Sequence, residues 1–500
     1  MILVTLLAAL LRFWNLTSLG YNSDEAVYAG QAATLSGDPL RSQFFSVFRA
    51  HPLLIAFLIS IPYRIFGTTQ VSVIEFWGRA VVAGSGTLTV SALYILAKVM
   101  YSKKAAVISS LLLALLPYHI LVSRQVLLDV GLGFFFVVTL IFLVKFAKTG
   151  NLIWAFGIGI STGFAVLSKE VGILLVPIIL IFLKLRNFLT LRSFLVMVGG
   201  FFLAIAPYPL ATLQGGASGR LLYVFQWQVS RPPNHTWLFY LFTLLPYFYL
   251  VAALGVLGGL LALRRRTPSD ILTLLWLAIP AAFFQFWTVK GFHYMIPVAP
   301  AVCLLAARFF DVNWARSFHV QLSRSVSPGT SRVFTTLLVL ITASTLFITY
   351  TNVVAASQTT PLAGLSGLQG TRELGRWIVA NVPEGSVFLT IGPTMANIIQ
   401  FYGNRQAYAL SISLNPIRRN PSYPAVYNPD YQIANGYIQY LAWDAYSGTR
   451  SPFFSGKLNS YIDRYHGKLL YTVYGTHRAG GGIVPVDLVR IYRVYGKLGT

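Results

Sequence analysis

Long apolar runs separated by short polar turns fill most of the first 354 residues, and this pattern predicts membrane-spanning helices. A helix needs roughly 20 apolar residues to cross a hydrocarbon core ~30 Å thick, and several of the runs are shorter than this. Together they predict an α-helical polytopic membrane domain over residues 1–354 with about eleven transmembrane helices. The runs fall at about residues 1–16, 76–98, 105–121, 129–145, 152–168, 171–185, 193–212, 237–262, 271–289, 292–310 and 333–354.

After residue 355 the pattern changes, because the long apolar runs end and Asn, Pro, Gly and Tyr become frequent. Apolar positions recur at helical spacing within 371–381, and a Pro-Glu-Gly turn then leads into a predicted strand at 386–391. The alternation of helices and strands predicts a small, water-exposed α/β domain over residues 355–500. Its other predicted elements are helices near 430–442 and 456–466, a long loop at 415–429, and strands near 468–474 and 485–495.

The composition agrees with a membrane protein, since 56% of the residues are hydrophobic and 10% are charged. A formal charge of +24 arises from 38 Lys plus Arg against 14 Asp plus Glu. If the N-terminus is cytoplasmic, the basic residues gather at the cytoplasmic turns, where they contact anionic membrane lipids. We therefore expect an integral protein of the plasma membrane with no nucleic-acid partner. The basic residues of these turns are Lys98, Lys103, Lys104, Lys145, Lys148, Lys184, Arg186, Arg192, Arg264 to Arg266, Arg308, Arg316, Arg324 and Arg332.

Two of the scarce acids stand side by side in the first predicted outer loop, residues 17–75. Asp24 and Glu25 open an amphipathic segment that ends at Gly37-Asp38-Pro39. A carboxylate at the membrane boundary could accept a proton from a hydroxyl nucleophile, bind a divalent metal or cap the helix N-terminus. The residues alone leave these three roles open.

Other polar residues fall at predicted outer boundaries of the membrane, and each also has a structural interpretation. The pair five residues apart near 124–129 fits an ion pair, and the charges that interrupt the apolar stretch 152–185 fit a turn between two short spans. The Lys and aromatic residues near 290–297 fit either an interfacial belt or a site for an anion with an apolar tail. These residues are His51, Arg124, Asp129, Lys169, Glu170, Lys290, His293 and Tyr294.

Several classes of protein are excluded by what the sequence lacks. A single cysteine, Cys303, excludes an intrachain disulfide and a thiolate metal cluster. No zinc-protease, phosphate-loop or nucleophile-elbow motif is present. Carboxylates and cations gathered on one side of the bilayer instead favour a base that works beside a lipid-linked phosphate.

The order of these motifs resembles the polyprenyl-phosphate-sugar-dependent glycosyltransferases of the GT-C fold, specifically the group that contains protein O-mannosyltransferases and the lipid A aminoarabinose transferase. The resemblance runs from Asp24 to Pro297, and the Asp-Glu motif of the first outer loop is its most specific part. It implies a GT-C membrane domain with an appended soluble domain. The matching residues are Asp24-Glu25 with Tyr28-Ala29, Gly37-Asp38, His51-Pro52, Arg124 with Asp129, Leu167-Ser168-Lys169, and Lys290 with Tyr294 and Pro297.

The resemblance also implies roles for single residues. Asp24 would be the catalytic base that deprotonates an acceptor hydroxyl, which attacks the anomeric carbon with inversion while prenyl phosphate leaves. Glu25 would position the acceptor or a cation, and Asp129 would orient Arg124. Cations would neutralise the charge that grows on the phosphate. The candidates for binding the donor phosphate are Arg124, Lys169, Lys290, His293 and Tyr294, with Asp129, Glu170 and His51 as supporting residues.

The expected function is therefore transfer of a single sugar from a polyprenyl-phosphate donor to a glycan, lipid or protein hydroxyl outside the cytoplasm. No obligatory cofactor is expected, and a divalent metal, if one binds, would use Asp24 and Glu25. A secondary transporter is the alternative from another class, because intramembrane charges also mark ion paths. En bloc transfer of a whole glycan, as by an oligosaccharyltransferase, and a surface-binding protein that displays residues 355–500 are further alternatives.

Overall fold

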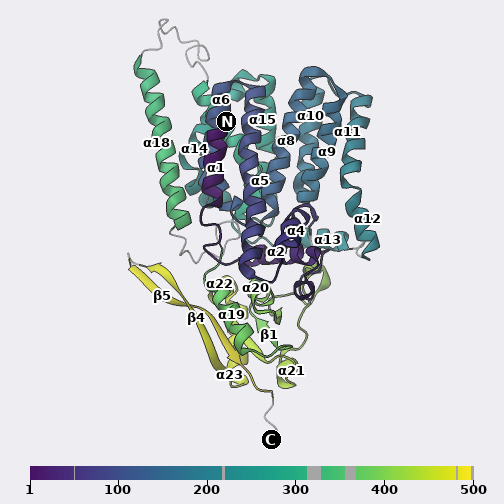
Figure 1. Cartoon of the computed structure of the whole chain (residues 1–500), viewed down its shortest axis with the longest axis vertical. Coiled ribbons are helices and arrows are strands. Elements are labelled where there is room, and N and C mark those ends of the chain that lie inside the picture. Colours follow the sequence, from purple (N-terminus) through teal and green to yellow (C-terminus); the bar gives the residue numbers. More distant parts are fainter. Residues whose placement is uncertain (50, 217–219, 312–327, 355–366, 480–481, 497–500) are drawn as a thin grey trace. The chain divides into compact units, whose positions relative to one another are not determined.

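The computed structural model describes residues 1–49, 51–216, 220–311, 328–354, 367–479 and 482–496 (Figure 1). Contacts divide the chain into two compact units. The first unit holds Met1–Leu16, Arg79–Gln214 and Pro233–Val354, and the second holds Thr17–Gly78, Gly215–Pro232 and Ala355–Thr500. Residues 17–75, the predicted first outer loop, thus belong to the same unit as the C-terminal residues. Arg316 and Arg324, which the sequence predicts at a cytoplasmic turn, lie outside the described residues.

The described part of the first unit is helical, and each predicted apolar run contains a helix. Helix α5 begins within the second unit and continues into the first. The helices are α1 (Ile2–Phe13), α5 (Val71–Met100), α6 (Lys103–Leu115), α7 (Pro117–Ser123), α8 (Leu128–Thr149), α9 (Leu152–Ser168), η1 (Glu170–Leu174), α10 (Leu175–Leu185), α11 (Leu191–Ile205), α12 (Pro207–Gln214), α14 (Phe239–Arg265), α15 (Pro268–Phe286), η2 (Phe292–Met295), α16 (Ala299–Asp311) and α18 (Pro328–Val354).

Among the described residues, 5 helices are long and apolar enough to cross a membrane, and a sixth results if α6 and α7, bent by 59°, form one span. Further apolar helices, such as α1 and α9, are shorter than a full crossing. A membrane protein built from several apolar helices is therefore confirmed, whereas the predicted number of spans stays a prediction.

Glycines allow α9 and α11 to pack at close range. A Cβ added at Gly159 of α9 would lie 2.0 Å from the carbonyl oxygen of Met197, and one added at Gly200 of α11 would lie 2.6 Å from that of Phe156. Small residues at such crossings let two backbones approach closely, which is how membrane helices gain packing contacts.

The second unit combines helices from the first outer loop with a C-terminal α/β fold. Its elements are α2 (Ser23–Ser36), α3 (Pro39–Ser42), α4 (Leu54–Phe66), α13 (Arg220–Ser230), α19 (Thr371–Asn381), β1 (Val387–Thr390), α20 (Pro393–Ile398), η3 (Ile399–Gly403), β2 (Gln406–Ala409), η4 (Pro416–Arg418), α21 (Pro429–Ala434), β3 (Tyr440–Asp444), α22 (Ala445–Arg450), α23 (Pro452–Arg464), β4 (Lys468–Ala479) and β5 (Gly482–Arg493).

A single five-stranded sheet organises the C-terminal part of this unit, with the strand order β2-β1-β3-β5-β4. Strand β1 pairs in parallel with β2 and β3, and β5 pairs antiparallel with β3 and β4. The segment α20–η3 supplies the crossover that the parallel pair β1 and β2 requires. The mixed α/β domain expected from the sequence is confirmed.

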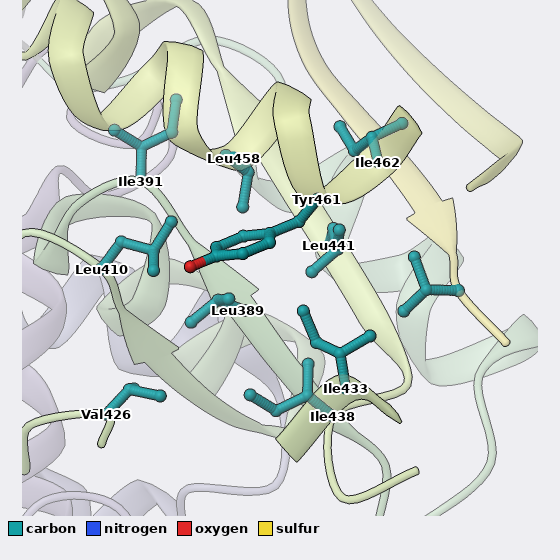
Figure 2. Packing of buried hydrophobic residues seen from close by; sticks show 11 residues of the cluster. Leu389, Ile391, Leu410, Val426, Ile433, Ile438, Leu441, Leu458, Tyr461 and Ile462 are labelled. Carbon is teal, nitrogen blue, oxygen red and sulfur yellow. The ribbon is translucent and has the colours of Figure 1, made fainter. Parts of the chain in front are cut away.

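One face of the sheet packs against α23 through a buried apolar cluster (Figure 2). Leu389 of β1 and Leu441 of β3 are register partners, and Figure 2 shows the ring of Tyr461 lying among them. Their neighbours Phe388 and Tyr440 alternate to the opposite face, where the two rings stack with centroids 5.0 Å apart. Each fully buried side chain of this kind contributes roughly 1.5–3 kcal/mol, so the cluster fixes the register of the central strands.

One prediction for this domain is wrong, and one strand was not predicted. The helix predicted near 430–442 is a helix only as far as Ala434, and residues Tyr440–Asp444 form strand β3. Strand β2 lies in a stretch for which the sequence predicted no element. The predicted helix at 371–381 coincides with α19, and the predicted strands near 468–474 and 485–495 lie within β4 and β5.

Candidate functional site

Helix α2 carries the Asp-Glu pair at its N-terminus. Asn22 is the N-cap residue, and its Oδ1 accepts hydrogen bonds from the backbone N–H groups of Asp24 at 3.0 Å and Glu25 at 3.1 Å. Glu25 Oε2 in turn accepts a hydrogen bond from the Asn22 backbone N–H at 3.1 Å, which completes a capping box. The helix ends at Gly37, which adopts φ 96° as a left-handed C-cap.

The two adjacent carboxylates therefore have different surroundings. Glu25 is fully buried and occupied with the helix end. Asp24 is partly exposed, and within the described part of the chain its carboxylate has neither a hydrogen-bond nor an ion-pair partner. The capping role, which the sequence left open for either acid, is filled by Glu25, and the Asp24 carboxylate is available to a ligand.

C-terminal residues of the same unit hold the region around α2. The Nδ2 of Asn397, on α20, donates a hydrogen bond to Ser23 Oγ at 2.9 Å. The hydroxyl of Tyr402, on η3, accepts a hydrogen bond from the Tyr21 backbone N–H at 2.7 Å and donates one to Glu75. These contacts fix the residues that precede Asp24.

Arg372 adds a second link between Glu75 and the segment before α2. Its Nε and Nη2 lie 2.8 Å and 2.6 Å from the two Glu75 oxygens. Nη2 also donates to the carbonyl oxygens of Thr17 at 2.6 Å and Leu19 at 2.9 Å. None of the residues in this network was predicted from the sequence, although the acid Glu75 at the start of the apolar run of α5 was a signal for it.

His51 also lies in the second unit, where its ring centroid is 6.1 Å from that of Tyr28. Tyr28 follows Asp24 by four residues on α2, so the two side chains share one face of that helix. The structure thus places His51 beside the helix of Asp24, and its predicted supporting role stays a prediction.

A buried cluster in the first unit brings together four of the other predicted residues. Lys169 Nζ donates to both carboxylate oxygens of Asp129, at 2.8 Å and 2.9 Å. His293 Nε2 lies 3.6 Å from Asp129 Oδ2, and Lys169 Nζ lies 4.4 Å from the centroid of the Tyr294 ring. Asp129, Lys169 and His293 are 2%, 5% and 7% exposed, so the local charges are poorly screened.

Local structure explains how Lys169 reaches this cluster. Helix α9 ends at Ser168 because Lys169 adopts an extended conformation, and η1 begins at Glu170. The break turns the Lys169 side chain toward the first turn of α8, where Asp129 lies, while Glu170 is exposed. This geometry agrees with the turn that the sequence predicted at Lys169-Glu170.

The prediction that Asp129 orients Arg124 is wrong, because Asp129 is bonded to Lys169. Arg124 instead donates four hydrogen bonds of 2.6–3.1 Å to backbone carbonyl oxygens at the end of α1, those of Leu11, Arg12, Trp14 and Asn15. Carbonyl groups at a helix C-terminus lack intrahelical partners and favour a nearby cation. Arg124 therefore stabilises the end of α1.

Lys290 has a similar position at the end of α15. Its Nζ donates to the carbonyl oxygens of Gln285 at 2.9 Å and Trp287 at 3.0 Å. The Asn234 side chain makes two hydrogen bonds to the Lys290 backbone. Asn234 Oδ1 accepts from the Lys290 N–H at 2.8 Å, and Asn234 Nδ2 donates to the Lys290 carbonyl oxygen at 2.9 Å. Two of the three protons on Nζ are thereby used.

Within the described residues, no group of three or more His, Cys, Asp or Glu could hold a metal ion. The second unit thus has an available carboxylate on α2, and the first unit has a buried lysine and histidine beside Asp129. The carboxylate can accept a proton, and a cation such as Lys169 can stabilise an anion.

Two family models match parts of the chain. The model described as dolichyl-phosphate-mannose-protein mannosyltransferase matches residues 50–210. The model described as the Alg9-like mannosyltransferase family matches residues 234–373. No curated protein matches the chain by sequence.

Solved structures resemble the chain over almost its whole length. ArnT from Cupriavidus metallidurans bound to undecaprenyl phosphate has a TM-score of 0.66 at 15% identity, covering 98% of this chain and 97% of that chain. The archaeal oligosaccharyltransferase AglB from Archaeoglobus fulgidus, in complex with an inhibitory peptide and a dolichol-phosphate, has a TM-score of 0.62 at 16% identity. That match covers 97% of this chain and 73% of that chain. At these identities the likeness establishes the fold, and the fold class expected from the sequence is confirmed.

Proposed function

We propose that the chain is a membrane glycosyltransferase of the GT-C class, which transfers a single sugar from a polyprenyl-phosphate donor to an acceptor hydroxyl outside the cytoplasm. The donor class is supported by ArnT bound to undecaprenyl phosphate and by AglB bound to a dolichol-phosphate. Transfer of one sugar is supported by the match to a model for a mannosyltransferase that uses dolichyl-phosphate mannose.

Asp24 is the proposed catalytic base. The observation that carries this assignment is the difference between the neighbours, since Glu25 is used in the capping box and the Asp24 carboxylate is not. In the proposed step the acceptor O–H proton passes to Asp24 and the oxygen attacks the anomeric carbon. The bond between that carbon and the phosphate oxygen breaks with inversion, and prenyl phosphate leaves with the electron pair.

The leaving phosphate gains negative charge and needs cations rather than an acid. Lys169 and His293, which share Asp129, remain candidates among the residues predicted to bind it, with Tyr294 beside Lys169. Arg124 and Lys290 also remain candidates, and each donates to neutral backbone carbonyls at a helix end, which leave its positive charge in place. Glu170 and His51 are proposed as supporting residues.

The proposal is tested by comparing two matched substitutions in adjacent residues, Asp24→Asn and Glu25→Gln, with a polyprenyl-phosphate sugar as donor. Loss of a general base costs about 10²–10⁴-fold in rate, so Asp24→Asn should lose at least this much while the purified protein unfolds at an unchanged temperature. Glu25→Gln should keep the capping box, because the amide oxygen can still accept the hydrogen bond from the Asn22 backbone N–H, and it should therefore fold normally and keep measurable turnover.

Turnover by Asp24→Asn close to the wild-type rate would exclude Asp24 as the base. The same assay repeated after chelation with EDTA tests the expectation that no metal is obligatory. An obligatory metal supplies several kcal/mol, so its removal would lower the rate by several powers of ten.

En bloc glycan transfer is the second candidate, and the likeness to AglB favours it. The two functions are separated by offering the protein a lipid-linked monosaccharide and a lipid-linked oligosaccharide with the same acceptor. Mass spectrometry of the product should show an added mass of one sugar. Addition of the whole oligosaccharide would replace the proposal with the alternative.

A further inference from the structure

A polar cavity of about 190 Å³ lies within the second unit, next to the N-terminal end of α2. Its walls come from the loop after α3, from α20 with the following η3, from β2 and from the loop after η4. A single water needs about 10–15 Å³ of such space, so the cavity has room for a much larger group. Polar lining residues include Arg49, Asn397, Gln400, Gln406, Ser422 and Tyr423.

Among the described residues that line this cavity, Arg49 is the only charged one. It is 5% exposed, and its Nη1 has no hydrogen-bond partner within the described part of the chain. Its Nη2 makes one long hydrogen bond, 3.4 Å, to Asn397 Oδ1, and its guanidinium carbon lies 4.9 Å from the centroid of the Tyr423 ring. A buried cation without a carboxylate is costly unless an anion compensates it.

Asn397 connects the Arg49 guanidinium to the N-terminal end of α2, the helix that carries the proposed base. Its Nδ2 donates to Ser23 Oγ and to the Tyr423 hydroxyl, both at 2.9 Å, while its Oδ1 accepts from Arg49. Ser23 directly precedes Asp24. A ligand bound to Arg49 would therefore lie next to Asn397, the residue that also holds the N-terminal end of α2.

We propose that this cavity binds an anionic sugar of the acceptor, through a carboxylate or phosphate group that the Arg49 guanidinium receives. This inference rests on the proposed function, and it names the class of acceptor. Arg49 suits such a group because a guanidinium can donate two parallel hydrogen bonds to an oxyanion. The Gln406 amide and the Tyr423 hydroxyl can donate to the hydroxyl groups of a sugar, and the side-chain oxygens of Gln400 and Ser422 can accept from them, because the Ser422 proton is already donated to the Arg49 carbonyl.

The test is a binding titration that needs no turnover, so its failure is separate from a failure of the proposed transferase reaction. Glucuronate, glucose 6-phosphate and glucose are titrated calorimetrically into the purified full-length protein. One or both anionic sugars should bind, with glucose at least tenfold weaker, because a hydrogen bond to a charged group is stronger than one between neutral groups. Comparison of the two anions distinguishes a carboxylate from a phosphate.

Arg49→Gln should weaken binding of the preferred anion by tenfold or more, whereas Arg376→Gln, at an exposed position of α19 in the same unit, should leave it unchanged. Arg49→Lys keeps the charge but loses the paired geometry, and should bind with intermediate affinity. If Arg49→Gln does not fold, the Lys variant and the preference for the anionic sugars over glucose decide the matter.

Three results would overturn the proposal. The first is that neither anion binds, and the second is that glucose binds as well as the anions do. The third is that undecaprenyl phosphate displaces the anionic sugar from the wild type and loses affinity in Arg49→Gln, which would assign the cavity to the donor.

Discussion

At the scale of single residues, the ion pair between Lys169 and Asp129 has the largest predicted effect on stability. Both side chains are buried, and loss of one partner leaves the other as an uncompensated charge. Lys169→Met should lower the free energy of unfolding by about 3–5 kcal/mol, measured by denaturant unfolding in detergent. The double substitution Lys169→Met with Asp129→Leu should cost less than the sum of the two single changes.

The control for this prediction is the pair Arg464 and Asp430, whose side chains are 58% and 41% exposed. Arg464→Met should cost no more than about 1 kcal/mol, because water screens the pair. Equal costs at the two sites would show that burial does not determine the strength of these pairs.

Asp444 predicts a dependence of stability on pH. Burial raises the pKa of this carboxyl to about 6, although a hydrogen bond from the Ser447 backbone N–H, 2.7 Å from Oδ1, opposes the shift. The folded state therefore binds this proton more tightly than the unfolded state, whose pKa is near 3.9. Stability should fall as the pH rises from about 4 to about 6 and change no further above this range, for a total of about 3 kcal/mol.

Asp444→Asn isolates this contribution, because the amide oxygen can still accept the hydrogen bond from Ser447 while it carries no charge. The variant should be less sensitive to pH between 4 and 6 than the wild type, as measured by unfolding at each pH. Parallel curves for the two proteins would exclude Asp444 as the group responsible.

The candidate residues could be selected from the sequence, but their contacts with one another could not be predicted from it. The pair Asp24-Glu25 stands out by its position in an acid-poor chain, yet only the capping geometry shows which acid is engaged. For Asp129, spacing favoured the nearby Arg124, whereas its partners Lys169 and His293 come from distant parts of the chain. Contacts of this kind depend on helix packing, which no local pattern encodes.

At the scale of elements, long periodic segments could be predicted and short strands could not. Helix α19 has a strong apolar face, and its predicted range was correct. Strand β3 is almost wholly buried over five residues, so it lacks the alternation that marks a half-exposed strand. In the sequence its apolar residues continue the helical pattern of α21, and one helix was therefore predicted across both. These residues form a strand because they pair with β1 and β5.

The close crossing of α9 and α11 predicts that Gly159→Ala destabilises the first unit. Its new methyl group would meet the Met197 carbonyl oxygen at 2.0 Å, and the helices would have to separate. Overpacking of this kind costs about 1–3 kcal/mol, which exceeds the gain of up to ~1 kcal/mol from the better helix propensity of Ala. The melting temperature in detergent should therefore fall.

Gly199 on α11 offers a matched control, because a Cβ there would have nothing within 4 Å. Gly199→Ala should be neutral or slightly stabilising, since only the propensity term remains. A similar loss of stability in both variants would mean that helix contact at Gly159 is not the cause.

At the scale of the whole molecule, the sequence predicted that the long apolar runs end near residue 355. It did not predict which segments of the chain belong to each unit. Composition shows where the apolar runs stop, whereas membership of a unit depends on contacts. The first outer loop joins the C-terminal residues through hydrogen bonds such as those of Tyr402 and Asn397. The sequence of a polar loop between apolar runs contains no pattern that indicates which other part of the chain it contacts.

The proposed sidedness can be measured with introduced cysteines, because the native Cys303 is fully buried. Lys457→Cys, at an exposed position of α23, should react with a membrane-impermeant maleimide in intact cells or spheroplasts. Lys103→Cys, exposed at the start of α6, should react only after lysis. The reverse pattern would invert the proposed topology.

The link between Asn397 and Ser23 joins residues 374 positions apart, and the bond from Tyr21 to Tyr402 joins residues 381 positions apart. At about 5–20 residues per second, a ribosome needs on the order of 20–75 s to extend the chain from one partner to the other. Over that interval the newly made Asp24 helix lacks the contacts that later fix it. A nascent or prematurely terminated chain that stops before α19 would carry the proposed base without its supports, so competence for transfer should arise only when synthesis is nearly finished.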